Sequence, residues 1–262
     1  MVQIVLVRGA GDVGSAVAHT LFAAGYRLAV HDLPAPTYGR RGMAFVDAIF
    51  DGSAVLAGTL AKRARTSAIA HMLDCRQALP ISTDGFAELL QAMRPDVLVD
   101  ARMMKRAVPE RQIDLAPLTI GLGPNFIATV TTHLAVETAW GPQLGKVITS
   151  GETLPLMGEP HDIGGFGRER FVYAPADGVF DTERRIGDWV DTGQILGDLS
   201  GTAVAAPLTG FVRGLTRPGV AVTHGTKIVE IDPRKTGAVV SGIGERPRRI
   251  AEGVLEAVRE KA

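Results

Sequence analysis

A glycine-rich segment between two apolar strands constrains the fold of this chain more than any other part of its sequence. Residues 2–7 and residues 27–31 are short apolar runs typical of buried strands. Between them lie a Gly-x-Gly-x-x-Gly motif and an amphipathic segment, residues 15–24. Strand, glycine loop, helix and strand in this order predict an α/β sheet that carries the loop at the carboxyl end of its first strand.

The glycine loop supplies the predicted cofactor-binding residues. Glycine permits a tight turn, a close approach of the backbone to a pyrophosphate, and close packing of helix on strand. An acid at the end of the second strand is placed to accept hydrogen bonds from a ribose diol. We therefore expect NAD or another adenine nucleotide to bind at Gly9, Ala10, Gly11, Asp12, Val13, Gly14 and Asp32. The alternative is a loop that holds no ligand, with Asp12 serving as a helix cap.

Two residues beyond a later strand are candidates for a role in substrate binding or catalysis. Asp100 and Arg102 follow the apolar run 96–100. Ligands of open α/β sheets bind in the crevice at the carboxyl ends of the strands. The alternative for this pair is a local salt bridge.

A second glycine loop and a histidine–glutamate pair follow further along the chain. Gly121 and Gly123 lie in a loop whose backbone N–H groups are suited to cradling an anion, although such a segment is also typical of a simple turn. His133 and Glu137 fall on one face of a predicted strand over 132–138, a pairing suited to acid–base chemistry or to a structural contact.

The C-terminal half contains an internal repeat with an offset of 32 residues. Residues 174–180 recur as residues 206–212, and each copy has short apolar segments separated by glycines. The repeat resembles the biotinyl/lipoyl domains, which implies a flattened all-β barrel. Carriers of that family attach their group to a lysine, and no lysine occurs between Lys146 and Lys227. We therefore expect no covalent biotin or lipoate.

These features predict an α/β fold class: a Rossmann-like, doubly wound, mostly parallel sheet plus a small barrel-sandwich-hybrid domain of the biotinyl/lipoyl type. The glycine- and proline-rich stretch between the two halves predicts a linker or flap. The expected domains are a nucleotide-binding domain (1–150), the linker (151–170), the barrel (171–233), and a C-terminal tail with a helix (234–262).

Composition narrows the classes of partner. Lys plus Arg and Asp plus Glu are 28 each, so no basic field exists for nucleic acid. The six histidines lack metal-ligand spacing, and the single cysteine, Cys75, fits a reducing compartment. The uncharged stretch 115–136 contains glycine, proline and histidine, which argues against a membrane helix. We expect a cytoplasmic protein without a metal, and the composition is compatible with a homo-oligomer.

Several motifs together resemble the selenium-dependent molybdenum hydroxylase accessory proteins, the YqeB family. The resemblance implies a cytoplasmic maturation factor whose partners are molybdenum hydroxylases or their other maturation factors. The segments that carry it lie at 8–15, 99–103, 120–126, 133–138, 163–170 and 174–178.

Three functions stay open from the sequence. The first is a nucleotide-binding accessory protein for molybdenum-cofactor-dependent hydroxylases. The alternatives are an NAD-dependent oxidoreductase of unknown substrate and a non-catalytic scaffold. His133, Glu137, Asp100 and Arg102 are the candidate catalytic residues, but none of them is identified as the acid–base group of a hydride transfer, so the sequence leaves open whether the chain is an enzyme.

Overall fold

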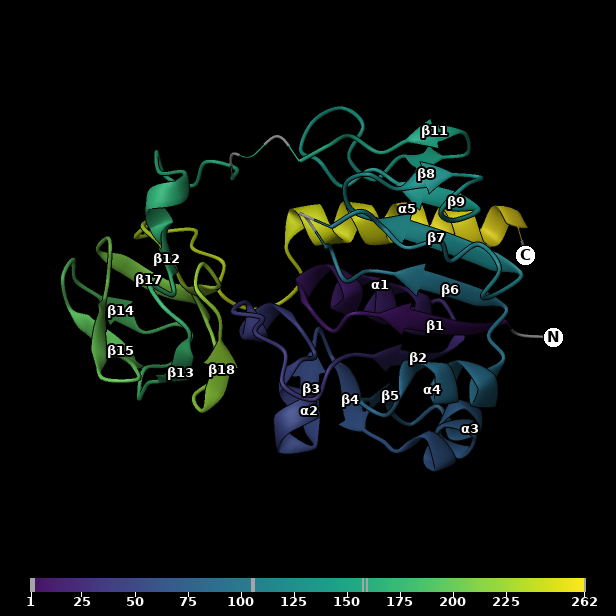
Figure 1. Cartoon of the computed structure of the whole chain (residues 1–262), viewed down its shortest axis with the longest axis horizontal. Helices are drawn as coiled ribbons and strands as arrows, with labels where there is room; N and C mark the ends of the chain where they lie inside the picture. The colour runs from purple at the N-terminus through teal and green to yellow at the C-terminus, as the bar shows by residue number, and fades with distance from the viewer. Residues whose placement is uncertain (1–2, 105–106, 157, 159, 262) are drawn as a thin grey trace. The chain divides into compact units, whose positions relative to one another are not determined.

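The computed structural model describes residues 3–104, 107–156, 158 and 160–261 (Figure 1). The chain forms two compact units. The first unit comprises Met1–Pro34, Ala44–Met157 and Ile243–Ala262, and the second comprises Ala35–Met43 and Gly158–Gly242. The segment Ala35–Met43 thus belongs to the second unit although it is surrounded in sequence by the first, and the C-terminal helix belongs to the first unit.

Nine strands of the first unit form one sheet, in the order β10-β9-β7-β6-β1-β2-β5-β4-β3. Its strands are β1 (Ile4–Arg8), β2 (Arg27–His31), β3 (Ser53–Leu56), β4 (Thr59–Arg63), β5 (Leu79–Ser82), β6 (Val97–Asp100), β7 (Leu118–Leu122), β9 (Leu134–Val136) and β10 (Val147–Ile148). A separate antiparallel pair joins β8 (Ile127–Ala128) to β11 (Gly151–Glu152). The strands predicted over 2–7, 27–31 and 96–100 correspond to β1, β2 and β6.

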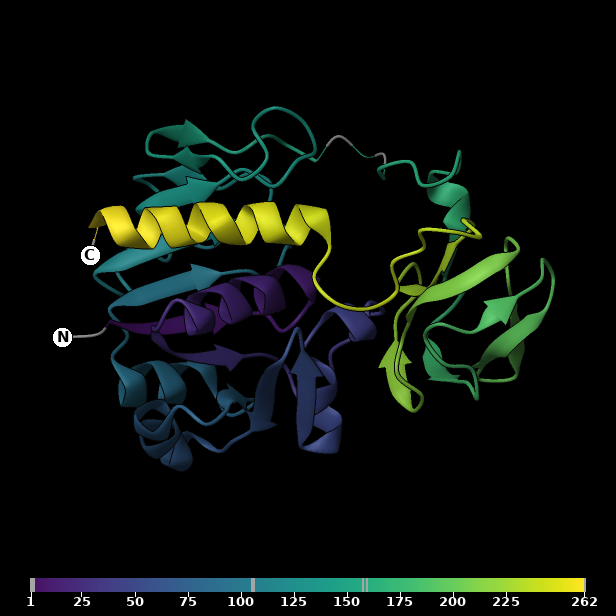
Figure 2. The same ribbon diagram turned by 180° about the vertical axis from the view of Figure 1, so that it is seen from behind.

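Helices cover both faces of this sheet. They are α1 (Asp12–Ala23), α2 (Asp47–Asp51), α3 (Thr66–Cys75), α4 (Phe86–Met93) and α5 (Glu245–Lys261). Side chains alternate between the faces of a strand, and on one face Leu6, Ala29 and Leu98 share a core with α3 and α4. Helix α5 lies beside α1 (Figure 2). It also contacts β9 and β10.

The predicted Rossmann-like, doubly wound sheet is wrong. The sheet is mixed, with antiparallel pairs β3–β4 and β9–β10 at its two edges. Strand β5 lies between β2 and β4, so the chain runs to an edge hairpin before it returns toward the centre. In the described residues no helix lies between β6 and β7 or between β7 and β9. The alternation of strand and helix therefore stops after β6, and α5, from the other end of the chain, contacts β9 and β10 beyond it.

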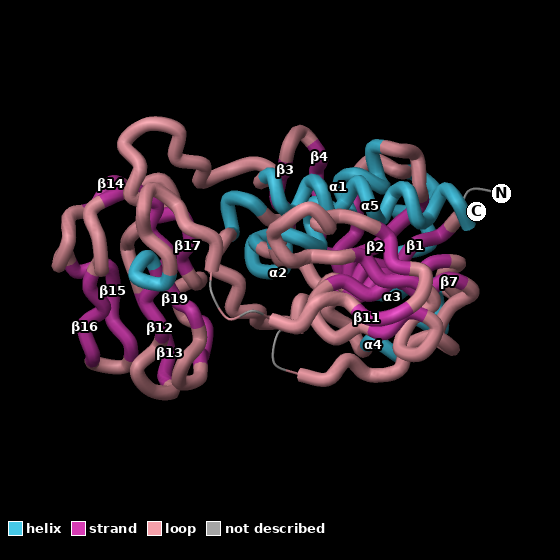
Figure 3. Tube along the Cα trace, turned by 90° about the horizontal axis from the view of Figure 1, so that it is seen from above, coloured by secondary structure: helices cyan, strands magenta, loops and turns pink. Residues whose placement is uncertain are grey.

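The described part of the second unit contains eight strands and two short 3₁₀ helices, joined by loops (Figure 3). The strands are β12 (Phe171–Tyr173), β13 (Gly178–Asp181), β14 (Trp189–Val190), β15 (Ile195–Leu199), β16 (Thr202–Ala205), β17 (Gly210–Leu215), β18 (Val220–Val222) and β19 (Lys227–Asp232). The 3₁₀ helices in the described residues are η1 (Arg41–Met43) and η2 (Arg168–Arg170). At the offset of 32 residues, β13 matches β17, β14 matches β18, and β15 matches β19, so the repeat is present in the structure.

The predicted biotinyl/lipoyl-like barrel is also wrong. The strands form two antiparallel sheets of four strands each, in the orders β12-β19-β17-β14 and β16-β15-β13-β18. No described strand pairing crosses from one sheet to the other, so the sheets do not close into one barrel. Matching strands of the two repeat copies lie in different sheets, and both sheets contribute to one core that includes Phe180 and Ile231.

The uncharged stretch 115–136 forms the short strands β7, β8 and β9 rather than a helix. More generally, none of the helices in the described ranges has both the length and the apolar character needed to cross a membrane.

Candidate functional site

The central parallel strands of the first unit end in polar side chains at one edge of the sheet. Arg8 of β1 is in register with His31 of β2 on one side and with Asp100 of β6 on the other. Parallel strands bring their carboxyl ends to the same edge, where α/β proteins bind ligands. The glycine loop, residues 9–14, begins directly after Arg8. We refer to this loop and these strand ends as the strand-edge site.

The three glycines of the loop, Gly9, Gly11 and Gly14, differ in their backbone conformation and in what a side chain would meet. Gly9 has φ +111°, and a Cβ there would lie 2.8 Å from the carbonyl oxygen of Ala101. At Gly14, in the first turn of α1, a Cβ would lie 1.9 Å from the carbonyl oxygen of Gly9. These contacts agree with the turn and packing roles expected from the sequence. Gly11 caps α1 with φ −69°, so its backbone does not itself require glycine, and its approach to a ligand stays a prediction.

Asp32 lies beside the loop. Its side chain is buried, and its carboxylate accepts hydrogen bonds from the N–H groups of Ala10 (2.5 Å) and Leu33 (2.7 Å). The acid at the end of β2 therefore contacts the glycine loop directly. Its contact with a ribose stays a prediction.

The carboxylate of Asp12 lies at the N-terminus of α1 and accepts a backbone hydrogen bond there. The N–H of Val13 donates to Oδ1 of Asp12 at 3.0 Å. Negative charge is favourable at a helix N-terminus, where phosphate groups also bind. Asp12 thus occupies an N–H group of the type that a bound phosphate would use, which is the capping alternative that the sequence left open.

A network of four charged side chains and one amide extends from Arg8. Nη1 of Arg8 donates to Glu110 at 2.6 Å and to Gln112 at 2.9 Å. Arg102 donates to both oxygens of Asp100, at 3.0 and 2.6 Å, and to Oε1 of Glu110 at 3.0 Å. The amide of Gln112 donates to Asp100 at 2.6 Å. The predicted salt bridge of Asp100 and Arg102 is therefore one part of a larger network, which we refer to as the Arg8–Arg102 network.

The network keeps its acids ionised. Burial by itself would raise the pKa of Asp100, but the hydrogen bonds and charge of Arg102 outweigh burial and leave the pKa below its ordinary value. The hydrogen bond from Arg8 lowers the pKa of Glu110. Burial lowers the pKa of His31, so this imidazole is neutral at pH 7.

The aromatic ring of Phe86 packs against Arg8 and His31 at the strand-edge site. The guanidinium carbon of Arg8 lies 3.8 Å from the centre of the Phe86 ring, and the His31 ring centre lies 5.4 Å from it. Nε2 of His31 is within hydrogen-bonding distance, 2.9 Å, of the Asp84 carbonyl oxygen. A guanidinium that stacks on a ring and bonds to a carboxylate is held in a fixed orientation.

His133 and Glu137 do not come together. Thr119 donates its N–H to Nδ1 of His133 at 3.1 Å. The buried Glu137 carboxylate accepts three backbone N–H groups at 2.7–2.8 Å, from Thr138, Ala139 and Leu154. No hydrogen bond or ion pair joins the two side chains in the described part of the chain. Strand β9 separates them, and Glu137 organises the backbone around it.

The second glycine loop follows β7, whose carboxyl end lies at the same edge as that of β6. A Cβ at Gly121 would lie 2.1 Å from the Phe126 ring, so this glycine makes room for the ring. Gly123 has φ +123° and Asn125 has φ +65°, which places a turn directly after the strand. Binding of an anion by this loop stays a prediction.

The sequence analysis did not single out Arg8, Glu110 or Gln112. The position of Arg8 directly before the glycine loop was a usable signal. Glu110 is 102 residues from Arg8, and no local pattern connects residues at that separation. Among the residues that the structure describes, no three His, Cys, Asp or Glu side chains gather as metal ligands.

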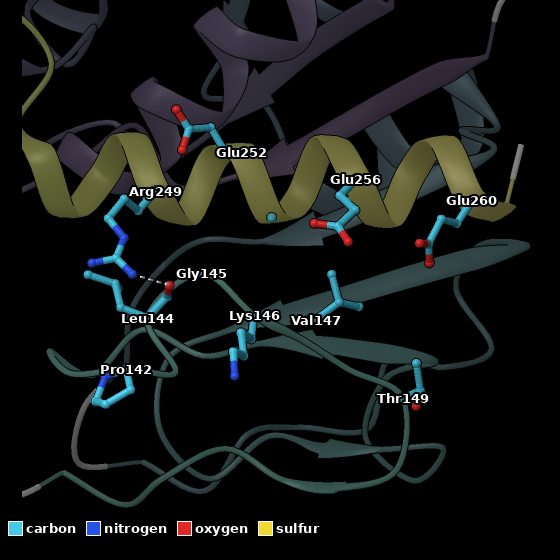
Figure 4. Close-up of a pocket in the computed structure, with 11 residues that line it drawn as sticks. Pro142, Leu144, Gly145, Lys146, Val147, Thr149, Arg249, Glu252, Glu256 and Glu260 are labelled. Carbon is cyan, nitrogen blue, oxygen red and sulfur yellow. Dashed lines mark hydrogen bonds between the residues drawn. The ribbon is translucent and has the colours of Figure 1, made fainter.

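A groove lies between α5 and the segment that leads into β10 (Figure 4). Glu256 and Glu260 project from successive turns of α5 toward this segment, and Glu252, which also lines the groove, points to the other side of the helix in this view. Arg249 donates to the carbonyl oxygen of Leu144 at 3.2 Å and ties the helix to this segment. The groove contains none of the residues predicted for a site.

Comparison with known proteins gives one relative in sequence, and no model of a protein family matches the chain. The chain is 39% identical over 256 residues to the uncharacterised protein YqeB of Escherichia coli K12. The match covers 98% of this chain and 47% of that protein, so the chain spans about half the length of this relative. The resemblance to YqeB is therefore confirmed along nearly the whole chain. The relative is itself uncharacterised, so this comparison does not test a role in molybdenum hydroxylase maturation.

The solved structures found are only distantly similar. The product-bound ectoine utilisation protein EutE (DoeB) from Ruegeria pomeroyi has a TM-score of 0.28 and 14% identity, and the match covers 89% of this chain and 86% of that chain. A succinylglutamate desuccinylase from Silicibacter sp. TM1040 has a TM-score of 0.25 and 13% identity over 87% and 84%. At these scores neither structure carries an argument about fold or function.

Proposed function

We propose that the first unit binds a nucleotide at the strand-edge site. The observation that carries this proposal is the meeting of three elements at one edge: the glycine loop at the start of α1, Asp32 beside it, and the guanidinium groups of Arg8 and Arg102. Each suits a different part of a nucleotide. Backbone N–H groups and guanidinium groups bind phosphate, and a carboxylate at the end of β2 binds the ribose hydroxyls.

Asp32 is compatible with this role although it already binds the loop. An ionised carboxylate offers about four acceptor positions. The ribose hydroxyls would share this carboxylate with the N–H groups of Ala10 and Leu33. Its negative charge disfavours a ligand with a 2′-phosphate, so an unmodified adenosine ribose is the expected partner.

We further propose that the nucleotide-binding chain acts as an accessory protein for molybdenum-cofactor-dependent hydroxylases. Support for this step is the resemblance of its motifs to the YqeB family together with the identity to YqeB along the chain. A pull-down from the native host should recover a molybdenum hydroxylase or another of its maturation factors. Recovery of neither, together with normal hydroxylase activity in a deletion strain, would contradict the accessory role.

Calorimetric titration with ADP and NAD tests nucleotide binding. The parent protein should bind at least one of the two, and Gly11→Ala should lose binding while its melting temperature stays close to that of the parent. The reason is that the methyl group stands where the backbone must approach the phosphate, at a φ that alanine tolerates.

Gly14→Ala is the matched comparison. Its methyl group meets the Gly9 carbonyl oxygen, so it should lower the free energy of unfolding by about 1–3 kcal/mol. Nucleotide binding by Gly11→Ala equal to that of the parent would show that the loop is only a turn. NADH oxidation by the purified protein with an added acceptor would instead favour the oxidoreductase.

A further inference from the structure

We propose that Arg8 and Arg102 form a clamp for an oxyanion, a phosphate or a carboxylate group of the ligand, and that Glu110 fills this clamp in the unliganded protein. The inference deepens the proposed function and rests on it for the position of the ligand beside the glycine loop. It names the residues that receive the anion and the internal group that the anion replaces.

The geometry of Glu110 is that of a bound carboxylate. A single oxygen, Oε1, accepts from Nη1 of Arg8 at 2.6 Å and from Nη2 of Arg102 at 3.0 Å. Two guanidinium groups that converge on one oxyanion are a common arrangement for recognising phosphate or carboxylate. A ligand oxygen at the same position would form the same two charge-assisted hydrogen bonds.

The two arginines are held in place without Glu110. Arg8 is nine-tenths buried, stacks on Phe86 and bonds to Gln112. Arg102 is fixed by Asp100, which is itself buried. Removal of Glu110 therefore leaves both guanidinium groups oriented toward the same point.

Two features mark Glu110 as the replaceable member. Its side chain is 55% exposed, whereas that of Arg8 is 9% exposed and that of Asp100 is 4% exposed. Nε of Arg8 is buried and has no hydrogen-bond partner among the described residues, so this guanidinium has a donor that the described part of the network does not use. An exposed carboxylate leaves an ion pair at little cost, because water solvates it well.

The charge balance agrees with an exchange of anions. Arg8 and Arg102 carry two positive charges, and Asp100 and Glu110 carry two negative charges. A ligand oxyanion that entered with Glu110 still in place would meet net negative charge, because Asp12 and Asp32 lie at the loop as well. Departure of Glu110 removes one negative charge and so offsets the charge of a singly charged group that arrives.

The test is calorimetric titration of the parent, Glu110→Gln and Asp114→Asn with sodium pyrophosphate, succinate and ADP. Asp114 is the matched control, because it lies in the same connection and pairs with Arg111 in an exposed ion pair outside the network. Glutamine keeps the size of Glu110 but competes poorly for the arginines. Glu110→Gln should bind pyrophosphate or succinate at least about fivefold more tightly than the parent, and Asp114→Asn should match the parent. The probe that gains affinity identifies the phosphate or the carboxylate as the natural group.

Unchanged or weaker binding by Glu110→Gln, an equal gain in Asp114→Asn, or no binding of either small anion by Glu110→Gln at millimolar concentration would overturn the clamp. ADP binding that Glu110→Gln does not strengthen would overturn the clamp and leave the proposed nucleotide site standing. A gain for succinate alone, without ADP binding by any variant, would support the clamp and contradict the nucleotide site.

Discussion

Each unit of this protein contains a network of arginines and carboxylates, and the two networks differ in how deeply their acids are buried. In the second unit, Glu230 is 1% exposed and Asp232 is fully buried. Glu230 accepts from Nε of Arg40 at 2.8 Å and from Nη1 of Arg170 at 2.9 Å. Nε of Arg213 lies 3.2 Å from it. We refer to these groups as the Glu230 network.

In the first unit, one acid of the Arg8–Arg102 network is buried and one is exposed. Asp100 is enclosed in the same manner as Glu230, between Arg102 and Gln112. Glu110 is more than half exposed and reaches the arginines from the connection between β6 and β7. This network thus combines a fixed part and a replaceable part.

The burial of its acids distinguishes a structural ion network from a binding site. A buried carboxylate surrounded by arginines cannot leave without stranding charges at low dielectric, so it holds the fold together. An exposed carboxylate in the same chemical setting can leave, and its arginines then accept another anion. Burial of the acid, rather than the number of arginines, separates the two networks.

The largest expected effect comes from breaking the Glu230 network. Glu230→Gln leaves Arg40, Arg170 and Arg213 without their shared charge partner. The free energy of unfolding of the second unit should fall by about 3–5 kcal/mol, measured by denaturant titration. The exposed Glu183 gives the control, because Glu183→Gln in the same unit should have little effect. A loss below 1 kcal/mol in Glu230→Gln would show that the network is not structural.

A second, smaller effect is expected from acid. Burial raises the pKa of Glu230, but the charges of Arg40, Lys227 and Arg213 outweigh burial and lower it to about 2. A depressed pKa gives stability that is complete above the unfolded value near 4.5 and is lost as the pH falls toward 2. The loss should reach about 3 kcal/mol. Melting curves between pH 6 and pH 2 measure it, and Glu230→Gln should lack this component of the pH dependence.

The smallest effect is expected for stability at Glu110. Because its side chain is 55% exposed, Glu110→Gln should change the free energy of unfolding by no more than about 1 kcal/mol. The same variant changes ligand affinity in the test above. A destabilisation as large as that of Glu230→Gln would mean that the two networks do not differ in kind.

Sequence patterns that span few residues predicted their parts of the structure well. The glycine motif, residues 9–14, joins β1 to the first turn of α1, as the local order of apolar and glycine residues predicts. The offset of 32 residues relates strands of the second unit, and the matched glycines Gly187 and Gly219 both have positive φ. These features depend on turn chemistry and hydrophobic period, which are local properties.

Features that depend on contacts between residues far apart in the chain could not be predicted from the sequence. The position of α5 against α1 and β10 joins the two ends of the chain, and the edge pair of β3 and β4 interrupts the expected strand order. A glycine loop specifies one strand–helix unit and does not fix the rest of a sheet, which is why the Rossmann-like prediction failed. Glu110 was missed for the same reason, since only the fold brings it to Arg8.

Hydrogen–deuterium exchange with and without saturating ADP shows where along the chain a nucleotide binds, and so tests the strand-edge site. We expect ADP to slow exchange in the glycine loop, residues 9–14, and to change it in the segment 107–114 that carries Glu110. Exchange around Arg170 and Glu230 should stay the same. Protection confined to the second unit, with no change at the glycine loop, would contradict the assignment of the strand-edge site.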